Sequence, residues 1–489
     1  MKKFLKDILY TVPLDEVYGN TACEINALEF DSRKLADNDV FFAIKGLKSD
    51  GHDFIPEAEK KNVRAIVHSD QVKNYKENIT YIKVADVQAA MGIMAANYFG
   101  QPANKLKLIG VTGTNGKTTV VSLLFQLFTK LGFKVGLIST VEYKIANKTY
   151  PSSFTTPDTL QLNKLFHEMV ENGCEYVFME VSSHAIEQKR IAGLKFTGAV
   201  FTNISHDHLD YHLNFQNYIT AKKKLFDSLG SMSFALVNVD DKRGTVMLQN
   251  TKARKRTFSL YTMADYKGKL LEQSFEGMLV NINSKEVFSL LLGEHNAWNL
   301  LTVFAVAIEL GIPEEEIFEP LSALKAPEGR FDYIKISKNG ITGIVDFAHT
   351  PDALKNTLAA INNMKNQKQQ VITVIGCGGN RDKEKRPLMA RIAAEMSDRV
   401  ILTSDNPRNE DPQAIIKEMK AGLHPALEKK ALSIPDRKEA IQLACSLSKD
   451  QDIILVAGKG HEKYQEINGE KHPFDDKLIL IHELKILNT

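Results

Sequence analysis

A glycine-rich turn between an apolar run and a helix-like segment constrains this chain more than any other feature. Residues 108–112 are mostly apolar, 113–118 read Gly-Thr-Asn-Gly-Lys-Thr, and 120–131 are again mostly apolar. Glycines let backbone N–H groups close around phosphate oxygens, and the N-terminus of a helix adds favourable potential. We therefore predict a strand, a phosphate-binding turn and a helix, with Lys117 on the β- and γ-phosphates and the Thr118 hydroxyl on Mg²⁺.

The glycine spacing of this turn departs from the usual phosphate-loop pattern, because Gly110 and Gly113 precede Gly116 by six and three positions. An ordinary turn between a strand and a helix is therefore the alternative interpretation. The Lys-Thr pair at the start of the helix favours a nucleoside triphosphate site, since it supplies the two side chains that such a site needs.

Length and composition indicate a globular protein of several domains. Domains typically contain ~150 residues, so the 489 residues of the chain predict about three domains. Its contents of 43% hydrophobic and 25% charged residues are ordinary for a soluble protein. The net charge of +2 gives no electrostatic reason to expect nucleic acid or an anionic membrane as a partner. No apolar run approaches the ~20 residues of a membrane span. We expect a monomer that acts on small molecules, with no nucleic acid and no membrane insertion.

The N-terminus and the cysteines both indicate the cytoplasm. The chain begins with a basic and apolar stretch like that of a signal peptide, but Lys6 and Asp7 interrupt it and no A-x-A-like cleavage site follows. The four cysteines are widely separated and form neither a C-x-x-C pair nor a metal-binding spacing. This usage is typical of reduced, mostly buried thiols in a cytoplasmic protein.

Two turn-rich connectors, at 99–106 and 325–330, divide the chain. Strand-like segments alternate with helix-like ones such as 387–396 and 412–423, which predicts an α/β protein with a parallel sheet in the middle region. We expect a small mixed α/β domain over 1–102, a central P-loop ATPase-like domain over 103–328 and a Rossmann-like domain over 329–489. The expected strands lie at 40–44, 65–68, 135–140, 176–181, 198–203, 342–347, 371–375, 400–403 and 453–457.

Four polar loops of the last region each follow a predicted strand directly. They span 348–352, 376–382, 404–408 and 458–462. Ligands of open parallel sheets bind at the carboxyl ends of the strands, so we expect these loops to converge on one crevice. The alternative is that they are merely good turn sequences.

The middle region carries a second group of ligand-like side chains. Glu180 follows a predicted strand, and the segment 203–212 contains His206, His208 and His212. A structural zinc site or a solvated loop is one interpretation of the histidines, but no cysteine joins them. A hard cation held by Glu180, a histidine and phosphate oxygens fits better, because Mg²⁺ binds few protein groups together with substrate oxygens.

Two further segments allow a purely structural interpretation. The lysines at 222–224 look like the solvated face of an amphipathic helix over 218–226. Asn296 and Asn299 stand three residues apart at the start of another helix-like segment. Asn296 could cap that helix, which is compatible with a contact to nucleotide.

Taken in this order, the motifs resemble the Mur ligases, the ATP-dependent amide-bond-forming enzymes of peptidoglycan precursor synthesis. The closest match is the MurE type, the UDP-N-acetylmuramoyl-tripeptide synthetases, and it runs over essentially the whole chain. The segments that carry the resemblance are 31–33, 113–118, 155–158, 180–184, 207–210, Tyr218 with Lys222, Asn296 with Asn299, 329–330 and the four polar loops.

The resemblance implies a UDP-binding first domain, an ATP-binding second domain and an amino-acid-binding third domain. Lys117, Glu180, His208 and Lys222 then take catalytic roles, and the ligands of two Mg²⁺ ions include Thr118, Glu180, His208 and Lys222. The residues implied for ATP are Gly113, Thr114, Asn115, Gly116, Lys117, Thr118, Thr119, Asn299 and Arg330. Those implied for the UDP-muramoyl dipeptide are Ser32 at the uridine end, Thr155, Thr156, Ser182, Gln188 and Arg190.

The resemblance changes the interpretation of the lysine run. Lys222 matches a lysine that relatives carry as a carbamate, an N6-carboxylysine formed with CO₂. Only a neutral amine forms a carbamate, so we expect a lowered pKa. The carbamate would hold the second Mg²⁺, and we expect Lys223 and Lys224 to be its solvated neighbours.

One position departs from the family pattern. Relatives commonly have a polar residue before the Thr155-Thr156 pair, whereas this chain has Phe154. The departure puts one hydrogen bond to the substrate in doubt.

The segment 404–408 reads Ser-Asp-Asn-Pro-Arg, as in ligases that add meso-2,6-diaminopimelate. Diaminopimelate is lysine with an extra carboxylate at its far end, which a planar guanidinium can bind bidentately. With lysine bound, we expect Arg408 to be desolvated and unpaired, which gives discrimination of ~10³ or more. The residues implied for the amino acid are Arg381, Asp405, Asn406, Pro407, Arg408, Gly458 and Glu462.

The resemblance implies a reaction in two steps. The terminal carboxylate of UDP-MurNAc-L-Ala-D-Glu, its γ-carboxylate by analogy with the family, attacks the γ-phosphorus of ATP, and the amine of diaminopimelate then attacks the carbonyl of the acyl phosphate. His349 is a candidate base by position alone. Three alternatives stay open: a folylpolyglutamate synthetase, although about 100 residues precede the phosphate loop, a lysine-adding ligase, and a regulatory NTP-binding protein.

Overall fold

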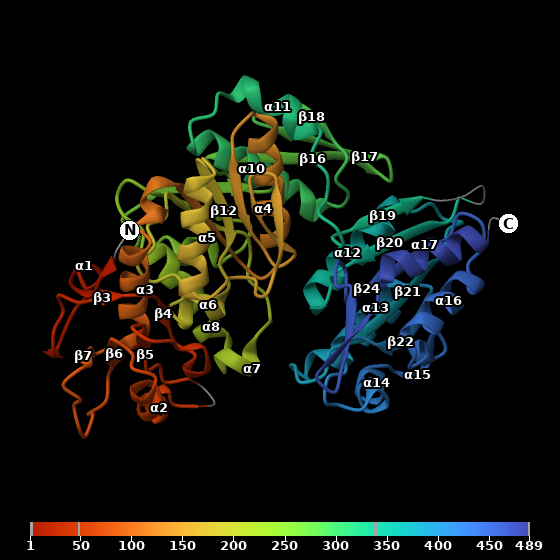
Figure 1. Ribbon diagram of the computed structural model, residues 1–489. Helices are drawn as coiled ribbons and strands as arrows, with labels where there is room; N and C mark the ends of the chain where they lie inside the picture. The colour runs from red at the N-terminus through yellow and green to blue at the C-terminus, as the bar shows by residue number, and fades with distance from the viewer. Residues whose placement is uncertain (1–2, 47–48, 336–339, 488–489) are drawn as a thin grey trace.

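The computed structural model describes residues 3–46, 49–335 and 340–487. Residues 1–2 and 47–48 of the predicted N-terminal domain and 336–339 and 488–489 of the predicted C-terminal domain lie outside the described residues. The chain forms three successive α/β units, each built on its own sheet. Figure 1 shows the N-terminal unit in red and orange and the C-terminal unit in teal and blue, on opposite flanks of the middle unit. Among the described residues, no helix is long and apolar enough to cross a membrane.

The N-terminal unit contains a five-stranded sheet between two helical layers. Strands β4 to β7 are parallel, and β2 pairs with β7 in the antiparallel direction. Helices α1 and α3 cover one face, and α2 covers the other. The predicted strands at 40–44 and 65–68 are confirmed. The strand order is β2 (Glu16–Tyr18), β7 (Thr80–Lys83), β6 (Ala65–His68), β5 (Val40–Phe42) and β4 (Leu28–Glu29). The other elements are β1 (Lys3–Phe4), β3 (Glu24–Ile25), α1 (Leu5–Ile8), α2 (Ile55–Lys60), α3 (Val87–Tyr98), and three short 3₁₀ turns at Ser32–Lys34, Gly51–Phe54 and Pro102–Lys105.

The middle unit contains an eleven-stranded sheet, and the strand before the phosphate loop lies in its interior between β12 and β13. The prediction of a parallel sheet is correct only for the seven strands from β9 to β16 in the strand order, while the strands beyond them at both edges are antiparallel. The edge strands follow one another through short turns, which allow only antiparallel pairing. The order is β11 (Lys148–Pro151), β10 (Glu142–Ile145), β9 (Val135–Ile138), β12 (Tyr176–Glu180), β8 (Lys107–Thr112), β13 (Gly198–Phe201), β14 (Phe234–Asn238), β15 (Arg254–Ser259), β16 (Tyr266–Ser274), β17 (Gly277–Ile282) and β18 (Lys285–Ser289).

Helices cover both faces of this sheet and form two apolar cores. One core contains α4 and α10, and α4 begins directly after Gly116 with all its apolar side chains but Phe125 buried. The other core contains α5 and α8. The helices of this unit are α4 (Lys117–Lys130), α5 (Thr159–Glu171), α6 (Ser183–Glu187), α7 (Leu209–His212), α8 (Phe215–Asp227), α9 (Gly244–Met247), α10 (Glu294–Glu309) and α11 (Glu314–Ser322).

The C-terminal unit is a six-stranded sheet in which only the edge strand β19 is antiparallel. Helices α12, α13 and α14 pack on one face, and α16 and α17 on the other. All four strands predicted for this region are confirmed, and so are its two helices. The strand order is β19 (Asp332–Lys335), β20 (Thr342–Asp346), β24 (Ile453–Ala457), β21 (Val371–Cys377), β22 (Arg399–Ser404) and β23 (Ala431–Ser433). The other elements are α12 (Pro351–Met364), α13 (Lys385–Met396), α14 (Pro412–Lys420), α15 (Pro425–Glu428), α16 (Arg437–Leu447), α17 (Asp476–Ile486) and the hairpin of β25 (Tyr464–Ile467) and β26 (Glu470–Pro473).

A buried ion pair fixes the edge of this sheet from which the polar loops leave. Arg437 pairs with Asp476 at 2.7 Å, and both side chains are fully buried. The same guanidinium donates to the carbonyl of Ala457 at 2.9 Å and to that of Ser404 at 3.3 Å, at the ends of β24 and β22. Because a buried charge without its partner is costly, this pair ties two loop origins to the helices behind them.

Candidate functional site

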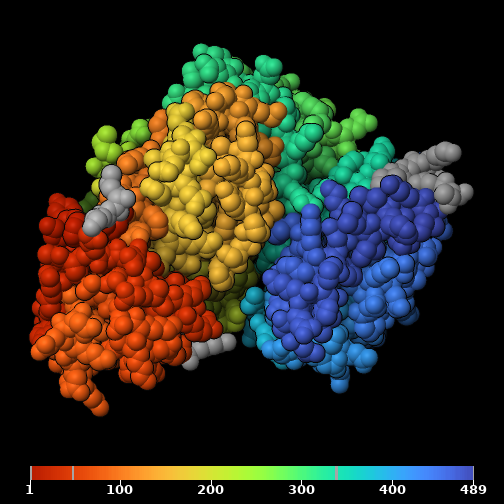
Figure 2. All heavy atoms as spheres, viewed as in Figure 1, coloured from red at the N-terminus to blue at the C-terminus, as the bar shows by residue number. Residues whose placement is uncertain are grey.

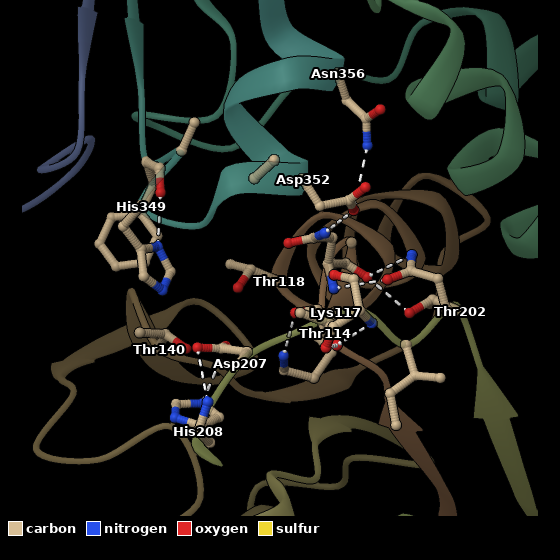
Figure 3. A pocket seen from close by; sticks show the side chains of 18 of the residues that line it. Thr114, Lys117, Thr118, Thr140, Thr202, Asp207, His208, His349, Asp352 and Asn356 are labelled. Carbon is tan, nitrogen blue, oxygen red and sulfur yellow. Dashed lines mark hydrogen bonds and ion pairs between the residues drawn. The ribbon is translucent and has the colours of Figure 1, made fainter. Parts of the chain in front are cut away.

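A cavity of about 950 Å³ lies between the middle and C-terminal units. Its wall includes the phosphate loop, the end of β12, the segment 202–208, the start of α10 and residues of all four polar loops. The predicted convergence of these loops is therefore found, and the interpretation as unrelated turns is wrong. Figure 2 shows the two units in contact along the flank of the middle unit, and Figure 3 shows side chains from both units directed into the cavity.

The phosphate loop packs so closely that two of its positions require glycine. Gly113 has φ +152°, and a Cβ there would lie 2.0 Å from the Thr202 hydroxyl oxygen. Gly116 has φ +86°, and a Cβ there would lie 2.7 Å from Oδ1 of Asn299. Only glycine combines these backbone angles with such close approach, so the loop is shaped by β13 and α10.

Lys117 is half-buried at the start of α4 and lies over the loop. Its Nζ donates to the carbonyl oxygens of Gly113 at 2.9 Å and of Thr114 at 2.8 Å. Burial lowers the pKa of Lys117, and Glu180 and Asp207 oppose that effect. The ammonium is thus held within reach of any anion that the loop binds.

Glu180, the last residue of β12, has one satisfied and one unsatisfied carboxylate oxygen. Its Oε1 accepts from the Thr118 hydroxyl at 2.8 Å and from the Thr140 amide at 2.7 Å. Its Oε2 is buried and accepts no hydrogen bond from the described residues. Buried carboxylate oxygens need a partner, and an oxygen beside a threonine hydroxyl suits Mg²⁺.

The three histidines of 203–212 have different partners in the described part of the chain. His208 lies 3.3 Å from Asp207, His206 lies 3.3 Å from Asp382 of the C-terminal unit, and His212 shares a hydrogen bond with Ser183. They form no common ligand set, which argues against the zinc interpretation. His206 instead reaches the opposite wall of the cavity.

His208 and Asp207 carry shifted pKa values. Burial lowers the pKa of His208 to about 3, although Asp207 opposes the shift. Burial by itself raises the pKa of Asp207, but His208 and neighbouring cations together bring it down to about 2. A neutral imidazole is the form that binds a metal ion, so His208 has the protonation state that its predicted role needs.

Lys222 is almost completely buried in α8. Its Nζ donates to the Gly113 carbonyl at 2.8 Å and lies 4.6 Å from the centre of the Tyr218 ring. Burial lowers its pKa well below the ordinary value, and the charge of Lys117 adds to the shift. A solvated face is therefore excluded for Lys222, and its amine is disposed to be neutral.

The expectation that Lys223 is solvated is wrong, whereas Lys224 is exposed. Lys223 is buried and pairs with Asp227 one turn later at 2.6 Å. Helix α8 contacts α6, α7 and α9, so more than one of its faces is covered. Lys224 pairs with Glu187 at 2.8 Å on the surface.

The residues implied for the muramoyl dipeptide form one connected group. Arg190 donates to Oε1 of Gln188 through Nε at 3.0 Å and Nη2 at 2.7 Å, and to the Thr156 carbonyl at 2.7 Å. Ser182 caps α6. Thr155 and Ser182 line the cavity, while Thr156, Gln188 and Arg190 are not part of its wall.

Phe154 is exposed and interacts with this group. The Arg190 guanidinium lies 5.2 Å from the centre of its ring. The Tyr143 hydroxyl donates to its carbonyl at 2.6 Å and accepts from its amide at 3.0 Å, which fixes its backbone. The departure from the family pattern thus replaces a polar side chain with a cation–π contact.

Ser32 stands apart from the cavity, in the N-terminal unit. It is buried, its hydroxyl donates to Glu57 at 3.0 Å, and its carbonyl accepts from Lys61 at 2.8 Å. The structure does not bring it into the group around Arg190.

The predicted amino-acid site is a recess of the cavity in the C-terminal unit. Arg381, Asp405, Asn406, Arg408, Gly458 and Glu462 line the cavity, while Pro407 lies behind it. Asn406 donates to Glu462 at 2.8 Å, and the buried Lys459 donates to Asn406 at 3.0 Å and pairs with Glu462 at 3.1 Å. These side chains hold one another in place.

Arg408 is already paired within the protein. Its Nε donates to Oε2 of Glu466 at 3.1 Å, and its Nη1 donates to the Gly379 carbonyl at 2.8 Å. The guanidinium therefore has protein partners before any amino acid binds, which the expectation of an unpaired Arg408 beside bound lysine did not include. One of them is Glu466, which the sequence reasoning missed because it belongs to none of the four loops.

His349 lines the cavity beside the phosphate loop. Its Nδ1 is hydrogen-bonded to the Phe347 carbonyl at 2.8 Å. Burial lowers its pKa to about 4, and Lys385, which donates to the His349 carbonyl at 3.0 Å, adds to the shift. His349 is a neutral imidazole near neutral pH.

Two contacts between the units were also missed. Asn115 of the phosphate loop donates to Asp352 of α12 at 2.8 Å, and Nη2 of Arg330 donates to the Thr118 hydroxyl at 3.1 Å. Figure 3 shows Asp352 above the phosphate loop. Asp352 lies in the polar loop 348–352, which directly follows a predicted strand. That position is the sequence signal that could have indicated a contact with the phosphate loop.

The chain matches three families along its length. Residues 24–99 match "Mur ligase family, catalytic domain", 111–307 match "Mur ligase middle domain", and 329–460 match "Mur ligase, glutamate ligase domain". Together the matches include the phosphate loop and the start of each of the four polar loops.

Curated and solved proteins resemble the chain over its full length. A UDP-N-acetylmuramoyl-L-alanyl-D-glutamate–2,6-diaminopimelate ligase of Cytophaga hutchinsonii is 52% identical over 477 residues, which are 97% of this chain and 98% of that protein. The ligase of the same name from Phocaeicola vulgatus is 52% identical over 476 residues, with the same shares of each chain covered. A solved structure bearing this name is 31% identical, covers 100% of both chains and has a TM-score of 0.70.

Proposed function

The chain belongs to the Mur ligase family, and we propose that it is an ATP-dependent amide ligase of peptidoglycan precursor synthesis. It adds 2,6-diaminopimelate to UDP-N-acetylmuramoyl-L-alanyl-D-glutamate, the two substrates that the names of its relatives give. The observation that carries the proposal is the single cavity in which Glu180 of the middle unit and Arg408 of the C-terminal unit both lie. We assign UDP binding to a domain over 1–102, ATP binding to a domain over 103–328 and amino-acid binding to a domain over 329–489.

The nucleotide end of the cavity binds ATP. The amides of 113–119 cradle the phosphates, Lys117 neutralises their charge, and Asn299 and Arg330 approach from α10 and the interdomain connector. Thr118, Glu180, His208 and a carbamylated Lys222 would hold Mg²⁺, with two ions in all. The unsatisfied oxygen of Glu180 and the lowered pKa of Lys222 support this donor set. Bound Mg²⁺ would offset the negative charge of the phosphates.

In the first step, an oxygen of the terminal glutamyl carboxylate attacks the γ-phosphorus of ATP. The bond from the γ-phosphorus to the bridging oxygen breaks, which gives an acyl phosphate and ADP. Two anions approach each other here, so Lys117 and the loop amides stabilise the developing charge. Ser32 binds the uridine end, and Thr155, Thr156, Ser182, Gln188 and Arg190 hold the muramoyl dipeptide.

In the second step, a neutral amine of diaminopimelate attacks the acyl carbon. The carbon–oxygen bond to phosphate breaks, inorganic phosphate leaves, and the amine loses a proton. His349 is the candidate for that proton, because it is neutral and lines the cavity. Contacts between the two units, such as Asn115 with Asp352, help to exclude water from the acyl phosphate.

The C-terminal recess selects the incoming amino acid. Arg408 and Arg381 bind the far carboxylate of diaminopimelate. Glu462 and Gly458 bind the far amino-acid centre that carries this carboxylate and its amine. Asp405, Asn406 and Pro407 shape the loop that presents Arg408. The ligase acts as a monomer in the cytoplasm, on small-molecule substrates.

An amide-forming assay with diaminopimelate and lysine in parallel tests the proposal. We expect ADP release and tripeptide formation that depend on both the UDP-dipeptide and diaminopimelate, with lysine used far less. Arg408→Ala should lose this preference. Equal use of both amino acids by the wild type would contradict the selectivity, and ATP hydrolysis indifferent to both substrates would favour a regulatory NTP-binding protein.

A further inference from the structure

We propose that Glu466 is a positioning residue for the amino acid substrate: its carboxylate holds the Arg408 guanidinium in the orientation that receives the far carboxylate of diaminopimelate. The inference rests on the proposed function and adds to it a residue outside the cavity wall. Arg408 lines the cavity and Glu466 does not, so Glu466 acts through Arg408.

The hairpin of β25 and β26 pairs with the Arg408 backbone through two hydrogen bonds. The Arg408 amide donates to the Glu466 carbonyl at 3.0 Å, and the Asn468 amide donates to the Arg408 carbonyl at 2.8 Å. Arg408 has φ +51°, a left-handed conformation that a residue with a side chain adopts at a cost. The hairpin therefore stabilises the conformation that turns Arg408 toward the cavity.

The Glu466 carboxylate then fixes the side chain. It accepts from Nε of Arg408 at 3.1 Å, while Nη1 donates to the Gly379 carbonyl at 2.8 Å. Nη2 makes no hydrogen bond with the described residues, so it keeps its donors for a ligand. At Gly378 a Cβ would lie 3.1 Å from Nη1, so the absence of a side chain there leaves room for the guanidinium.

The ion pair also suits the charge of the ligand. The side chains of Arg408 and Glu466 are 20% and 26% exposed, so solvent screens their interaction only in part. The far end of diaminopimelate carries a carboxylate and an ammonium side by side. A guanidinium whose charge is offset by Glu466 donates to the carboxylate and repels the ammonium less than a free guanidinium would.

Steady-state kinetics of Glu466 variants test the proposal. We expect Glu466→Ala to raise KM for diaminopimelate about tenfold, since one charge-assisted hydrogen bond is lost, with kcat and the KM values for ATP and the UDP-dipeptide within about twofold. Glu466→Gln keeps an acceptor for Nε and should raise KM by only about threefold. Glu470→Ala, on the exposed face of the paired strand β26, is the matched control and should match the wild type.

A double mutant shows whether Glu466 acts through Arg408. In an Arg408→Ala background, Glu466→Ala should change KM for diaminopimelate no further. An undiminished tenfold effect in that background, or an unchanged KM in the single variant, would overturn the proposal. So would a parallel fall in kcat and rise in every KM, which marks a structural defect. If Glu466→Ala does not fold, Glu466→Gln decides, because an unchanged KM then overturns the proposal. A wild type that makes no use of diaminopimelate would instead refute the proposed function.

Discussion

The two ends of the cavity differ in how their charged groups are satisfied. At the nucleotide end, one oxygen of Glu180 has no hydrogen bond within the described residues, and Lys222 is buried with a carbonyl and a ring as neighbours. At the amino-acid end, Arg408 is paired with Glu466, and Lys459 with Glu462. The nucleotide end thus depends on its ligands to balance charge, whereas the amino-acid end is preorganised by its own hydrogen bonds.

Mutations at the two ends should therefore differ in the size of their effects. A group that no protein atom satisfies contributes to catalysis through the ligand alone, so its loss removes the whole contribution. A group within a hydrogen-bonded network is partly replaced by its neighbours, so its loss changes affinity and selectivity more modestly.

The largest effect is expected for Glu180→Gln. The variant keeps an acceptor for Thr118 and Thr140 but removes the charge of the unsatisfied oxygen. We expect kcat to fall about 10³-fold, which is ~4 kcal/mol of transition-state stabilisation, as measured by ADP release. The matched control is Glu187→Gln at the surface pair with Lys224. Activity within about threefold of the wild type would remove the contrast between the two ends.

The next effect concerns Lys222 and CO₂. We expect Lys222→Ala to lower kcat about 10²-fold, because the carbamate oxygens are lost. Wild-type activity in CO₂-free buffer should fall and recover on addition of bicarbonate, while the variant stays indifferent to both. Lys224→Ala, exposed on the same helix, should behave as the wild type. A wild type that ignores bicarbonate would exclude the carbamate.

At the amino-acid end, Arg408→Lys should have a smaller effect on the reaction. An ammonium keeps the charge but cannot bond Glu466 and a substrate carboxylate through a planar fork. We expect kcat/KM for diaminopimelate to fall about thirtyfold, or ~2 kcal/mol, with kcat little changed. Competition between diaminopimelate and lysine measures the accompanying loss of preference. A fall in kcat as large as that of Glu180→Gln would mean that both ends act alike.

A smaller effect is expected for substitution of Phe154, which lies beside Arg190 among the residues proposed to hold the muramoyl dipeptide. An exposed cation–π contact contributes ~0.5–1 kcal/mol, so Phe154→Ala should raise KM for the UDP-dipeptide about threefold. Phe154→Tyr keeps the ring and should match the wild type. If both variants behave alike in the KM assay, the contact with Arg190 is irrelevant to binding.

The smallest effect is a pH dependence of stability in the C-terminal unit. Arg386 donates to Glu410, and this hydrogen bond lowers the carboxyl pKa to about 2, below its ordinary 4.5. A depressed pKa means that the contribution is complete above about pH 4.5 and is lost as pH falls toward 2. Because Glu410 is partly exposed, we expect about 1 kcal/mol or less.

Thermal melting between pH 5 and 2 measures this contribution. Glu410→Gln should melt lower than the wild type at the upper end of that range, and the difference should shrink as the pH falls. A constant difference across the range would show that the ion pair contributes nothing through its charge.

The sequence predicted the strands around the site well because their signals are local. Buried runs such as 371–375 and 453–457 are continuous and end in polar loops, which fixes both the strand and the edge of the sheet that faces the ligand. The antiparallel edges of the middle sheet were not predicted, because short hairpin strands such as β10 and β11 carry too little periodic signal to be told from turns.

Pairing between distant segments could not be predicted. Glu466 meets Arg408 only because the β25–β26 hairpin packs on the loop after β22, 58 residues earlier in the chain. Lys223 looked like a solvated lysine because its partner Asp227 and the packing of α8 depend on the tertiary structure. The spacing of motifs thus indicates which loops meet, but not which side chains satisfy one another.

Transfer of an isotopically labelled oxygen from the substrate to phosphate shows whether the ligase forms an acyl phosphate. The UDP-dipeptide is prepared with ¹⁸O in its terminal glutamyl carboxylate and incubated with the protein, ATP and diaminopimelate. The account predicts that inorganic phosphate gains one ¹⁸O for each amide bond formed, because the carboxylate oxygen attacks phosphorus and leaves with it. Phosphate without label, together with labelled amide product, would contradict the acyl phosphate and the proposed use of the cavity.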